Sequence, residues 1–495
     1  MDTQRQSPAS QNNSPERELP PHVTQDAVVI VPGIMGSELR DTKTRKILWG
    51  LSGTRWLVSA WMRRQGLQKL HLTEEELAGA TGRIEATQLL RHSTWTPYLR
   101  GQEPYTQLTD TVLDYVADPA AVCEFPYDWR LPVATNGKLL AQRAREHLTT
   151  WRNHPRHHQA LTHRADQRPA RLVFIAHSMG GLVTRCALDG THHDDLAADT
   201  RTVITLGTPF YGAVKAAAIL NSGRGAPVPL PHRKLQALCH TMPGLHDLLP
   251  LYRCLRTGDD VVRLDTGSVT ALGGQADLAR DSFDFHSRQQ KVLLPGHRAL
   301  AGTRQSTWQS LTLDSGMVSP HEDGARHNRD GSLIRDRSGR LVYYSVQGDG
   351  TVYRDSAAQG EHLSTAPVQH GDLARADTSL NTVIDILLED EPQGPPLGEP
   401  GCGILTPDLV ESGQTWHAIA EHTDSLQGLT CTVTDTQDDR TAKPARMAMR
   451  DGRPAAEITI TDAGLYRVSL STRDGHTVSQ LVLVAEPGLD AAETD

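Results

Sequence analysis

One serine stands where an enzyme would carry a nucleophile. Residues 171–185 read RLVFIAHSMGGLVTR, with Ser178 between a short apolar run and an amphipathic segment. The run 172–176 is rich in β-favouring residues and predicts a buried strand, and the residues after the turn have helical spacing. Small residues, Ala176 and Gly180, lie two places on either side of the serine. This is the pattern of a nucleophile elbow, although many serine–glycine turns only connect elements.

A glycine-rich turn near the start of the chain is a candidate for the oxyanion hole. Residues 27–31 (AVVIV) predict a buried strand, and PGIMGS follows at 32–37. The turn lacks the sequence of a phosphate-binding loop and that of a dinucleotide site. With the elbow serine downstream, we expect the backbone N–H of Ile34 to face a bound ester, and the N–H of Met179 to be the second donor.

A serine nucleophile needs a base and a carboxylate, which follow it in this order: serine, acid, histidine. Asp349 lies between two glycines after the apolar run 341–346, which predicts a strand. Alone, it would be interpreted as a surface-turn aspartate. His370 precedes a predicted closing helix at 378–388, where a loop would reach back over the sheet, and His362 remains the alternative base.

The elements around these residues predict an α/β fold. Strands alternate with helices, which indicates a mostly parallel sheet covered on both faces. Ligands of such a sheet bind beyond the carboxyl ends of its strands, where the elbow and the glycine-rich turns would gather. The expected strands are 27–31, 121–125, 172–176, 201–206 and 292–301, and the expected helices are 105–116 and 139–151.

Shifts in composition along the 495 residues predict several parts. We expect a disordered tail at 1–25, an α/β-hydrolase domain at 26–388 with lid or cap insertions at about 47–100 and 213–290, a proline-rich linker at 389–400 and an immunoglobulin-like β-sandwich at 401–495. The sandwich is predicted from alternating runs separated by the turns Asp451-Gly452 and Asp474-Gly475, and from Tyr466, which resembles a tyrosine corner.

The first insertion carries aromatic and basic residues together. Trp56 and Trp61 are followed directly by Arg63 and Arg64. Such a cluster suits a lipid interface, where an indole ring spans apolar and polar zones. The alternative is a small satellite core, because clustered tryptophans are usually buried.

The charge and composition exclude several classes of protein. The net charge is −9 and the two signs are interspersed, so no nucleic-acid footprint is expected, although a local patch could still contact a membrane surface. Residues 1–25 contain no apolar signal segment, and no apolar run approaches the roughly 20 residues of a membrane span. We therefore expect a cytoplasmic protein that is peripheral at a membrane at most.

The cysteines and histidines indicate neither a metal nor a cofactor. The six cysteines form no CxxC pair and are expected to be reduced, with a disulfide between Cys239 and Cys254 as the alternative. Among 23 histidines, His177 is adjacent to Ser178, which rules it out as the base. Loose groups without a repeated ligand spacing occur at His154, His157, His158, His163, His192 and His193.

Seven motifs together resemble landmarks of the lecithin–cholesterol acyltransferase family of α/β-hydrolases, in that family's order. They are VPGIMGS at 31–37, LWG at 48–50, PYDWR at 126–130, AHSMGG at 176–181, LGTPFYGA at 206–213, GDGTV at 348–352 and HGDL at 370–373. The resemblance covers about residues 27–388. It implies Ser178, Asp349 and His370 as the triad and Ile34 and Met179 as oxyanion donors. The secretion signal and disulfides of secreted members are missing, which argues against an extracellular lipoprotein role.

The sequence thus predicts a serine hydrolase that cleaves lipid or other hydrophobic acyl esters, as a lipase, phospholipase or esterase does. If an alcohol replaced water, the same residues would make an acyltransferase. A third hypothesis is a silent hydrolase scaffold whose β-sandwich recognises a protein partner.

Overall fold

A computed structural model describes most of the chain. The described residues are 23–50, 67–90, 105–162, 167–191, 196–223, 232–328, 331–359, 362–389, 403–407, 409–421, 423–436, 442–473 and 477–485. The cluster of Trp56, Trp61, Arg63 and Arg64 and most of the predicted linker lie outside these ranges. Thr24 and Gln25, at the end of the predicted tail, are buried.

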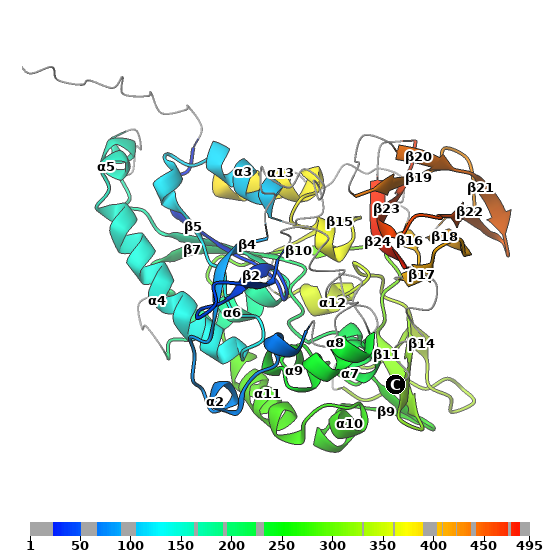
Figure 1. Cartoon of the computed structure of the whole chain (residues 1–495). Helices are drawn as coiled ribbons and strands as arrows, with labels where there is room; N and C mark the ends of the chain where they lie inside the picture. Colours follow the sequence, from blue (N-terminus) through cyan, green and yellow to red (C-terminus); the bar gives the residue numbers. More distant parts are fainter. Residues whose placement is uncertain are drawn as a thin grey trace, which may run out of the picture.

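A six-stranded parallel sheet forms the centre of the larger domain (Figure 1), which confirms the predicted α/β class. In spatial order its strands are β15 (His362–Ala366), β10 (Arg298–Gly302), β7 (Thr200–Leu206), β6 (Leu172–His177), β1 (Ala27–Val31) and β5 (Val122–Glu124). Its central strands β1 and β6 are buried along their whole length because both faces are covered.

Helices cover the sheet on both sides. Helix α4 (Val133–Arg152) packs on α6 (Met179–Ala187), and both contact β1. On the opposite face α3 (Thr106–Asp114) lies beside α13 (Asp377–Leu387), as Figure 1 shows. The serine turn between β6 and α6 is therefore fixed by packing on both of its sides.

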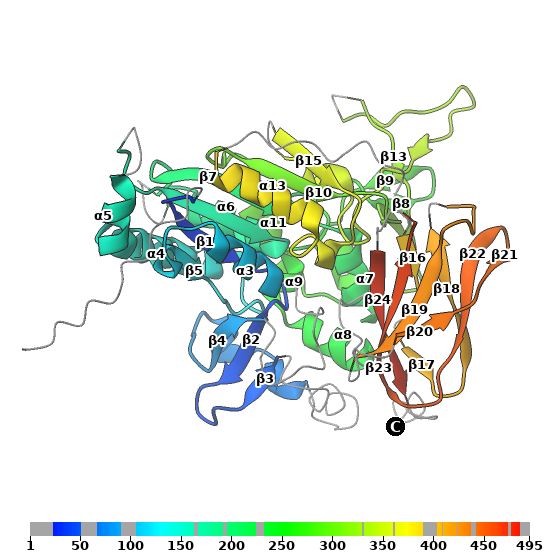
Figure 2. The ribbon, with the colours of Figure 1, turned by 90° about the horizontal axis from the view of Figure 1, so that it is seen from above.

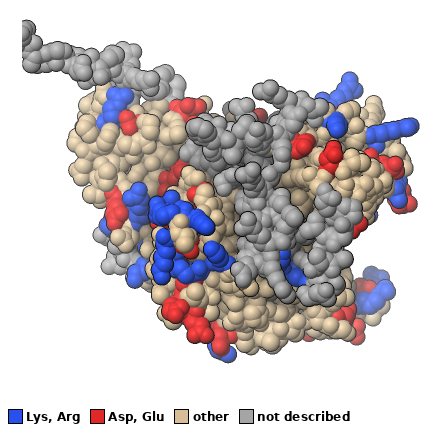
Figure 3. All heavy atoms as spheres, viewed as in Figure 1, with Lys and Arg blue, Asp and Glu red and all other residues tan. Residues whose placement is uncertain are grey.

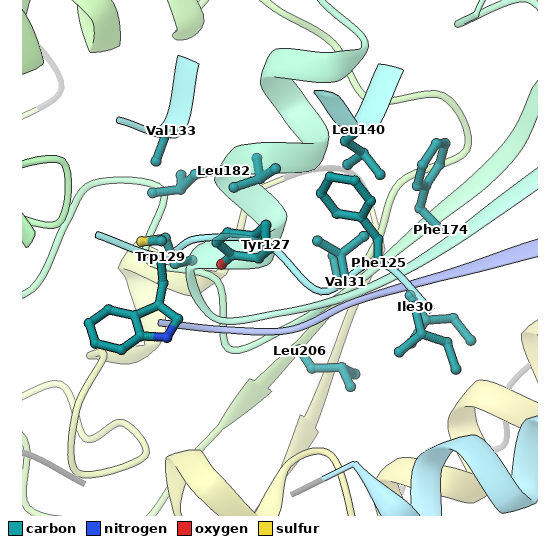
Figure 4. Close-up of a cluster of buried hydrophobic side chains, with 14 of the residues drawn as sticks. Ile30, Val31, Phe125, Tyr127, Trp129, Val133, Leu140, Phe174, Leu182 and Leu206 are labelled. Atoms are coloured by element: carbon teal, nitrogen blue, oxygen red, sulfur yellow. The ribbon is translucent and has the colours of Figure 1, made fainter. Parts of the chain in front are cut away.

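The core beside the serine turn is built from elements far apart in sequence (Figure 4). Val31, Phe174 and Leu182 from β1, β6 and α6 are almost fully buried. Phe125 and Trp129, which follow β5, pack into the same cluster. Burial of this kind stabilises by about 1.5–3 kcal/mol per large apolar side chain, so the turn rests on a rigid base.

The strand prediction for 341–346 is wrong. Only Tyr343–Tyr344 forms a strand, β14, which pairs with β13 (Gly324–Ala325) outside the main sheet. The edge strand of the main sheet is instead β15, which the sequence analysis missed. In its sequence, HLSTA, only Leu363 and the β-branched Thr365 favour a strand, which is a weak signal. The strand forms because β10 offers a parallel partner.

The segment after β7, predicted as a cap, is mostly helical. Helix α9 (Pro243–His246) packs against α7 (Val214–Ser222) and α11 (Ala276–Gln289). Strand β8 (Leu255–Thr257) joins a second, four-stranded sheet with β9 (Asp260–Val262), β11 (Ser310–Asp314) and β12 (Met317–His321). Its role as a lid stays a prediction. The other helices of this segment are α8 (His232–His240) and α10 (Thr266–Ala271).

Three short strands and a short helix follow the glycine-rich turn. The strands β2 (Ser37–Asp41), β3 (Ile47–Trp49) and β4 (Ile84–Leu89) form an antiparallel sheet, with helix α2 (Glu74–Leu77) beside it. Two further short helices are α5 (Pro155–Leu161), after α4, and α12 (Arg354–Ala357), after the Asp349 loop.

The C-terminal part is a sandwich of two sheets, as predicted. One sheet contains β16 (Gly403–Leu405), β18 (Thr415–Glu421), β22 (Arg453–Thr459) and β21 (Met447–Arg450); the other contains β17 (Leu409–Glu411), β24 (Thr477–Ala485), β23 (Gly464–Ser471), β19 (Thr430–Asp435) and β20 (Ala442–Ala445). The strand pairs are antiparallel except for the parallel pair of β17 and β24. Asp451 and Gly452 both have positive φ in the β21–β22 turn, and the Tyr466 hydroxyl donates to the Asp462 carbonyl at 3.0 Å. The turn at Asp474-Gly475 lies outside the described residues.

Cys239 and Cys254 are separate buried thiols, so the alternative disulfide does not form. Within the described ranges, no helix combines the length and the apolar character needed to cross a membrane.

A buried histidine in the cap should make stability depend on pH. Burial, with Arg185 as a second cause, lowers the pKa of His286 to about 4. As pH falls below 6.5 the unfolded chain takes up a proton that folded His286 does not, so stability present above pH 6.5 is lost on the way to pH 4. We expect this residue to cost about 2 kcal/mol between pH 7 and pH 5. Urea unfolding of wild type and His286→Gln at both values should show the flatter dependence in the variant; parallel curves would contradict it.

Candidate active site

Ser178 occupies a strained turn at the carboxyl edge of the sheet. Its φ is 53° and its ψ is −126°, a combination that non-glycine residues rarely adopt. The Ser178 N–H donates to the Leu206 carbonyl at 2.9 Å, which ties the turn to β7. A Cβ at Gly180 would overlap the carbonyl oxygens of Val31 and Pro32, so only glycine fits there. Close passage of the two backbones is the physical reason for the small residue in the motif.

The structure brings Ser178, His370 and Asp349 together. His370 Nε2 lies 2.8 Å from Ser178 Oγ, and His370 Nδ1 lies 2.7 Å from Asp349 Oδ2. The side chain of Asp349 is fully buried and that of His370 is 14% exposed. The imidazole therefore bridges a buried carboxylate and the serine hydroxyl, which is the contact order of a serine-hydrolase triad.

The other carboxylate oxygen of Asp349 is held by the backbone. Its Oδ1 accepts from the N–H groups of Thr351 at 2.9 Å and Val352 at 2.7 Å. The backbone N–H of His370 donates to the backbone carbonyl of Asp349 at 2.9 Å. The two loops are therefore joined through both their main chains and their side chains. These bonds leave Oδ2 facing the imidazole.

His362, the alternative base, does not reach the site. It opens β15 and pairs in register with Arg298, at the amino end of the parallel strands. The serine turn follows the carboxyl end of β6, so the two lie at opposite edges of the sheet. The alternative assignment is therefore wrong.

The glycine-rich turn approaches the serine directly. A Cβ at Gly33 would come within 2.8 Å of Ser178 Cβ, which places the next residue, Ile34, beside the nucleophile. Met179 begins α6, so its N–H is one of the donors that a helix leaves unpaired. Among the described residues neither the Ile34 nor the Met179 N–H has a hydrogen-bond acceptor. These two donors belong to the segments that adjoin Ser178, which fits the predicted oxyanion hole.

A buried hydrogen-bond chain, which the sequence analysis missed, joins this turn to His370. The Gly33 N–H donates to the Tyr105 hydroxyl oxygen at 2.7 Å, and the hydroxyl lies 2.9 Å from His177 Nδ1. His177 Nε2 lies 2.9 Å from the His370 carbonyl, so it carries the proton and Nδ1 accepts from Tyr105. Burial lowers the pKa of His177 to about 3, with His370 as a second cause, so the ring stays neutral at pH 7. His177 is thus a structural partner of the base.

Removal of the Tyr105 hydroxyl should weaken the site without changing substrate affinity. Tyr105→Phe leaves the Gly33 N–H and His177 Nδ1 buried and unpaired, which costs about 1–3 kcal/mol of stability. We expect kcat to fall about tenfold with KM unchanged, because the loop that presents the oxyanion donor loosens. Steady-state kinetics and thermal unfolding measure both effects. An unchanged kcat in a destabilised variant would show that the bond serves folding alone.

Aromatic residues of two motifs hold the same turn. The Tyr127 hydroxyl donates to the Pro32 carbonyl at 2.9 Å, and Trp129 Nε1 donates to the Ser37 carbonyl at 3.2 Å. Trp49 Nε1 donates to the Met35 carbonyl at 2.9 Å, and its ring packs edge-on against Trp129 at 5.1 Å. The turn is therefore fixed before any substrate arrives, as an oxyanion hole requires.

Within the described ranges, no group of three or more histidine, cysteine or acidic residues is arranged to hold a metal ion. His157 of the loose histidine group bonds the backbone through both ring nitrogens, to Arg152 and Ala170. His163, His192 and His193 lie outside the described residues.

The parallel sheet and the strained serine turn between β6 and α6 define the larger domain as an α/β-hydrolase. Residues 81–292 match the family model described as lecithin:cholesterol acyltransferase. The match confirms the resemblance that the motifs predicted.

Solved structures give further similarities. A chain of the Tle4–Tli4 complex is 15% identical, covers 73% of this chain and 98% of its own, and has a TM-score of 0.46. For the mature Bacillus licheniformis lipase BlEst2 the identity is 14%, the coverage 76% and 96%, and the TM-score 0.31. For the M1 domain from titin these values are 16%, 18% and 97%, and 0.13. No curated protein matches.

Proposed function

We propose that this protein is a serine acyl hydrolase that cleaves lipid or other hydrophobic acyl esters. The observation that carries the proposal is the unbroken contact chain from Ser178 Oγ through His370 to Asp349. In the proposed reaction His370 Nε2 takes the serine proton and Oγ attacks the ester carbonyl. The oxyanion binds the N–H groups of Ile34 and Met179, and His370 then protonates the leaving alcohol.

Water completes the hydrolysis by attacking the acyl-enzyme while His370 acts as base. An alcohol in its place would yield a new ester and a transferase, and the family match favours this second candidate. His370 can remove a proton from water or from an alcohol in the same way. The outcome therefore depends on how well the site excludes water. A silent scaffold would leave the buried carboxylate, imidazole and hydroxyl without a use.

We further propose that the protein acts at a lipid surface. The turn between β2 and β3 exposes Lys43, Arg45 and Lys46, and Ile47 beside them is 40% exposed. In the view of Figure 3, basic side chains gather over this part of the molecule. The sheet that carries the turn begins directly after the oxyanion turn, so contact there would bring lipid towards the serine.

Turnover on a panel of substrates tests this proposal. The panel holds phospholipid vesicles of zwitterionic and anionic composition, acylglycerols and short nitrophenyl esters, each with and without an added long-chain alcohol. Released fatty acid indicates the hydrolase, and a new ester indicates the transferase. Preference for short soluble esters would contradict the lipid surface, and no product from any ester would contradict the enzyme.

A further inference from the structure

The C-terminal sandwich is attached to the hydrolase domain by a strand that is buried on both faces. Val482 and Val484 of β24 lie in the sandwich core, whereas Leu483, between them, belongs to the core of the hydrolase domain. Leu465 of β23 joins the same hydrolase core. Figures 1 and 2 show these two strands as the part of the sandwich nearest to the hydrolase domain. An apolar joint of this kind fixes the orientation of the sandwich.

Polar contacts beside this joint reach the loop that carries His370. Asp372, two residues after His370, pairs with Arg375 at 2.5 Å. Arg375 also donates to the Ser479 hydroxyl of β24 at 3.3 Å, and Arg467 of β23 acts electrostatically on Asp372. The base loop is therefore tied to β24 by a hydrogen bond, and Arg467 of β23 adds an attractive charge for Asp372.

A second set of contacts reaches the support of the Asp349 loop. Gln305 exchanges two backbone hydrogen bonds with Gly348, the residue before Asp349, at 3.0 and 3.3 Å. Gly403 of β16 packs so closely on Gln305 that an added Cβ would lie 2.9 Å from its Oε1. Glu421, the partner of Gly403 in the sheet, accepts from the Ser306 backbone N–H.

We propose that the sandwich positions the acid and the base of the site relative to each other. It contacts the loop that carries His370 and the residues that support the Asp349 loop, which lie in separate segments of the chain. Arg375, Arg467, Ser479 and Glu421 are positioning residues. This role rests on the proposed function. In this proposal the sandwich is a structural part of the active site and not a freely tethered recognition domain.

Variants on both sides of the contact between the sandwich and the base loop test the proposal in the full-length protein. Arg467→Met and Ser479→Ala should each lower kcat several-fold, and Arg375→Met about tenfold, with KM unchanged. Ser479→Thr keeps the hydroxyl and should restore the rate. The matched controls are Ser469→Ala, whose serine pairs with Ser479 in the sheet, and Arg450→Met on the other sheet. Both should keep wild-type kcat.

A spectroscopic measurement separates this proposal from the proposed function. In protein labelled with ¹⁵N-histidine, the His370 Nδ1 proton is identified by its loss in His370→Gln. The resonance should shift or broaden in Arg467→Met and Arg375→Met but not in Arg450→Met. If the wild type is inactive but its resonance responds in this way, the proposed enzymatic function is wrong and the positioning role is supported. Unchanged kcat and resonance in all three sandwich-contact variants would overturn the positioning role.

Discussion

Ser178→Ala is expected to abolish ester hydrolysis. His370 Nε2 contacts the Ser178 hydroxyl at 2.8 Å, and alanine leaves the imidazole without this hydroxyl to deprotonate. Loss of the nucleophile in a triad lowers kcat by on the order of 10⁶-fold, with the residual rate coming from the oxyanion donors. Within the described residues the hydrogen-bond partner of Ser178 Oγ is His370, and alanine keeps the Cβ, so the variant should fold like the wild type.

A fluorophosphonate probe gives a direct measurement. It should label wild type on the peptide that contains Ser178 and leave Ser178→Ala unlabelled. Ser282→Ala is a matched control, because Ser282 is also buried and its hydroxyl donates to the His246 carbonyl in the cap. This control should label and turn over like wild type. A folded wild type that resists labelling would count decisively against the nucleophile.

Asp349→Asn should be nearly as damaging, although it changes no volume. The backbone N–H groups of Thr351 and Val352 point at Oδ1, so the asparagine oxygen must face them and its NH₂ must face His370. Nδ1 would then accept, and the ring proton would move to Nε2, where it blocks proton transfer from Ser178. An imidazole held in the wrong tautomer costs about 10⁴-fold in kcat.

The measurement is kcat and KM for wild type, Asp349→Asn and Asp349→Ala, with circular dichroism to establish folding. KM should change little, because the carboxylate is buried behind the imidazole and away from substrate. Asp355→Asn, an exposed aspartate six residues later, should leave both constants unchanged. A kcat for Asp349→Asn within a few-fold of wild type would exclude Asp349 from the reaction.

Asp349 was predicted as the acid of the triad from a secondary-structure prediction that was partly wrong. The sequence predicts it after a strand at 341–346, but only Tyr343–Tyr344 forms a strand there, and that strand lies outside the main sheet. The Gly-Asp-Gly segment is instead held by Gln305, which bonds Gly348 from 43 residues away in sequence, and by the turn to Val352. The glycine pattern predicted a tight turn correctly, because backbone geometry is local. The support of the turn was not predictable, because it is not local.

The local pattern of the sequence determined the serine turn, the parallel α/β class and the β-sandwich, because alternation, helical spacing and glycine-dependent turns act within about ten residues. Tertiary structure alone decided between His362 and His370, since only the register of β15 on β10 shows which end of the sheet each occupies. It alone revealed Tyr105 and the contacts of the sandwich, which join residues 72 or more positions apart. Such contacts leave no periodic trace in the chain, because each depends on where whole elements come to rest against one another.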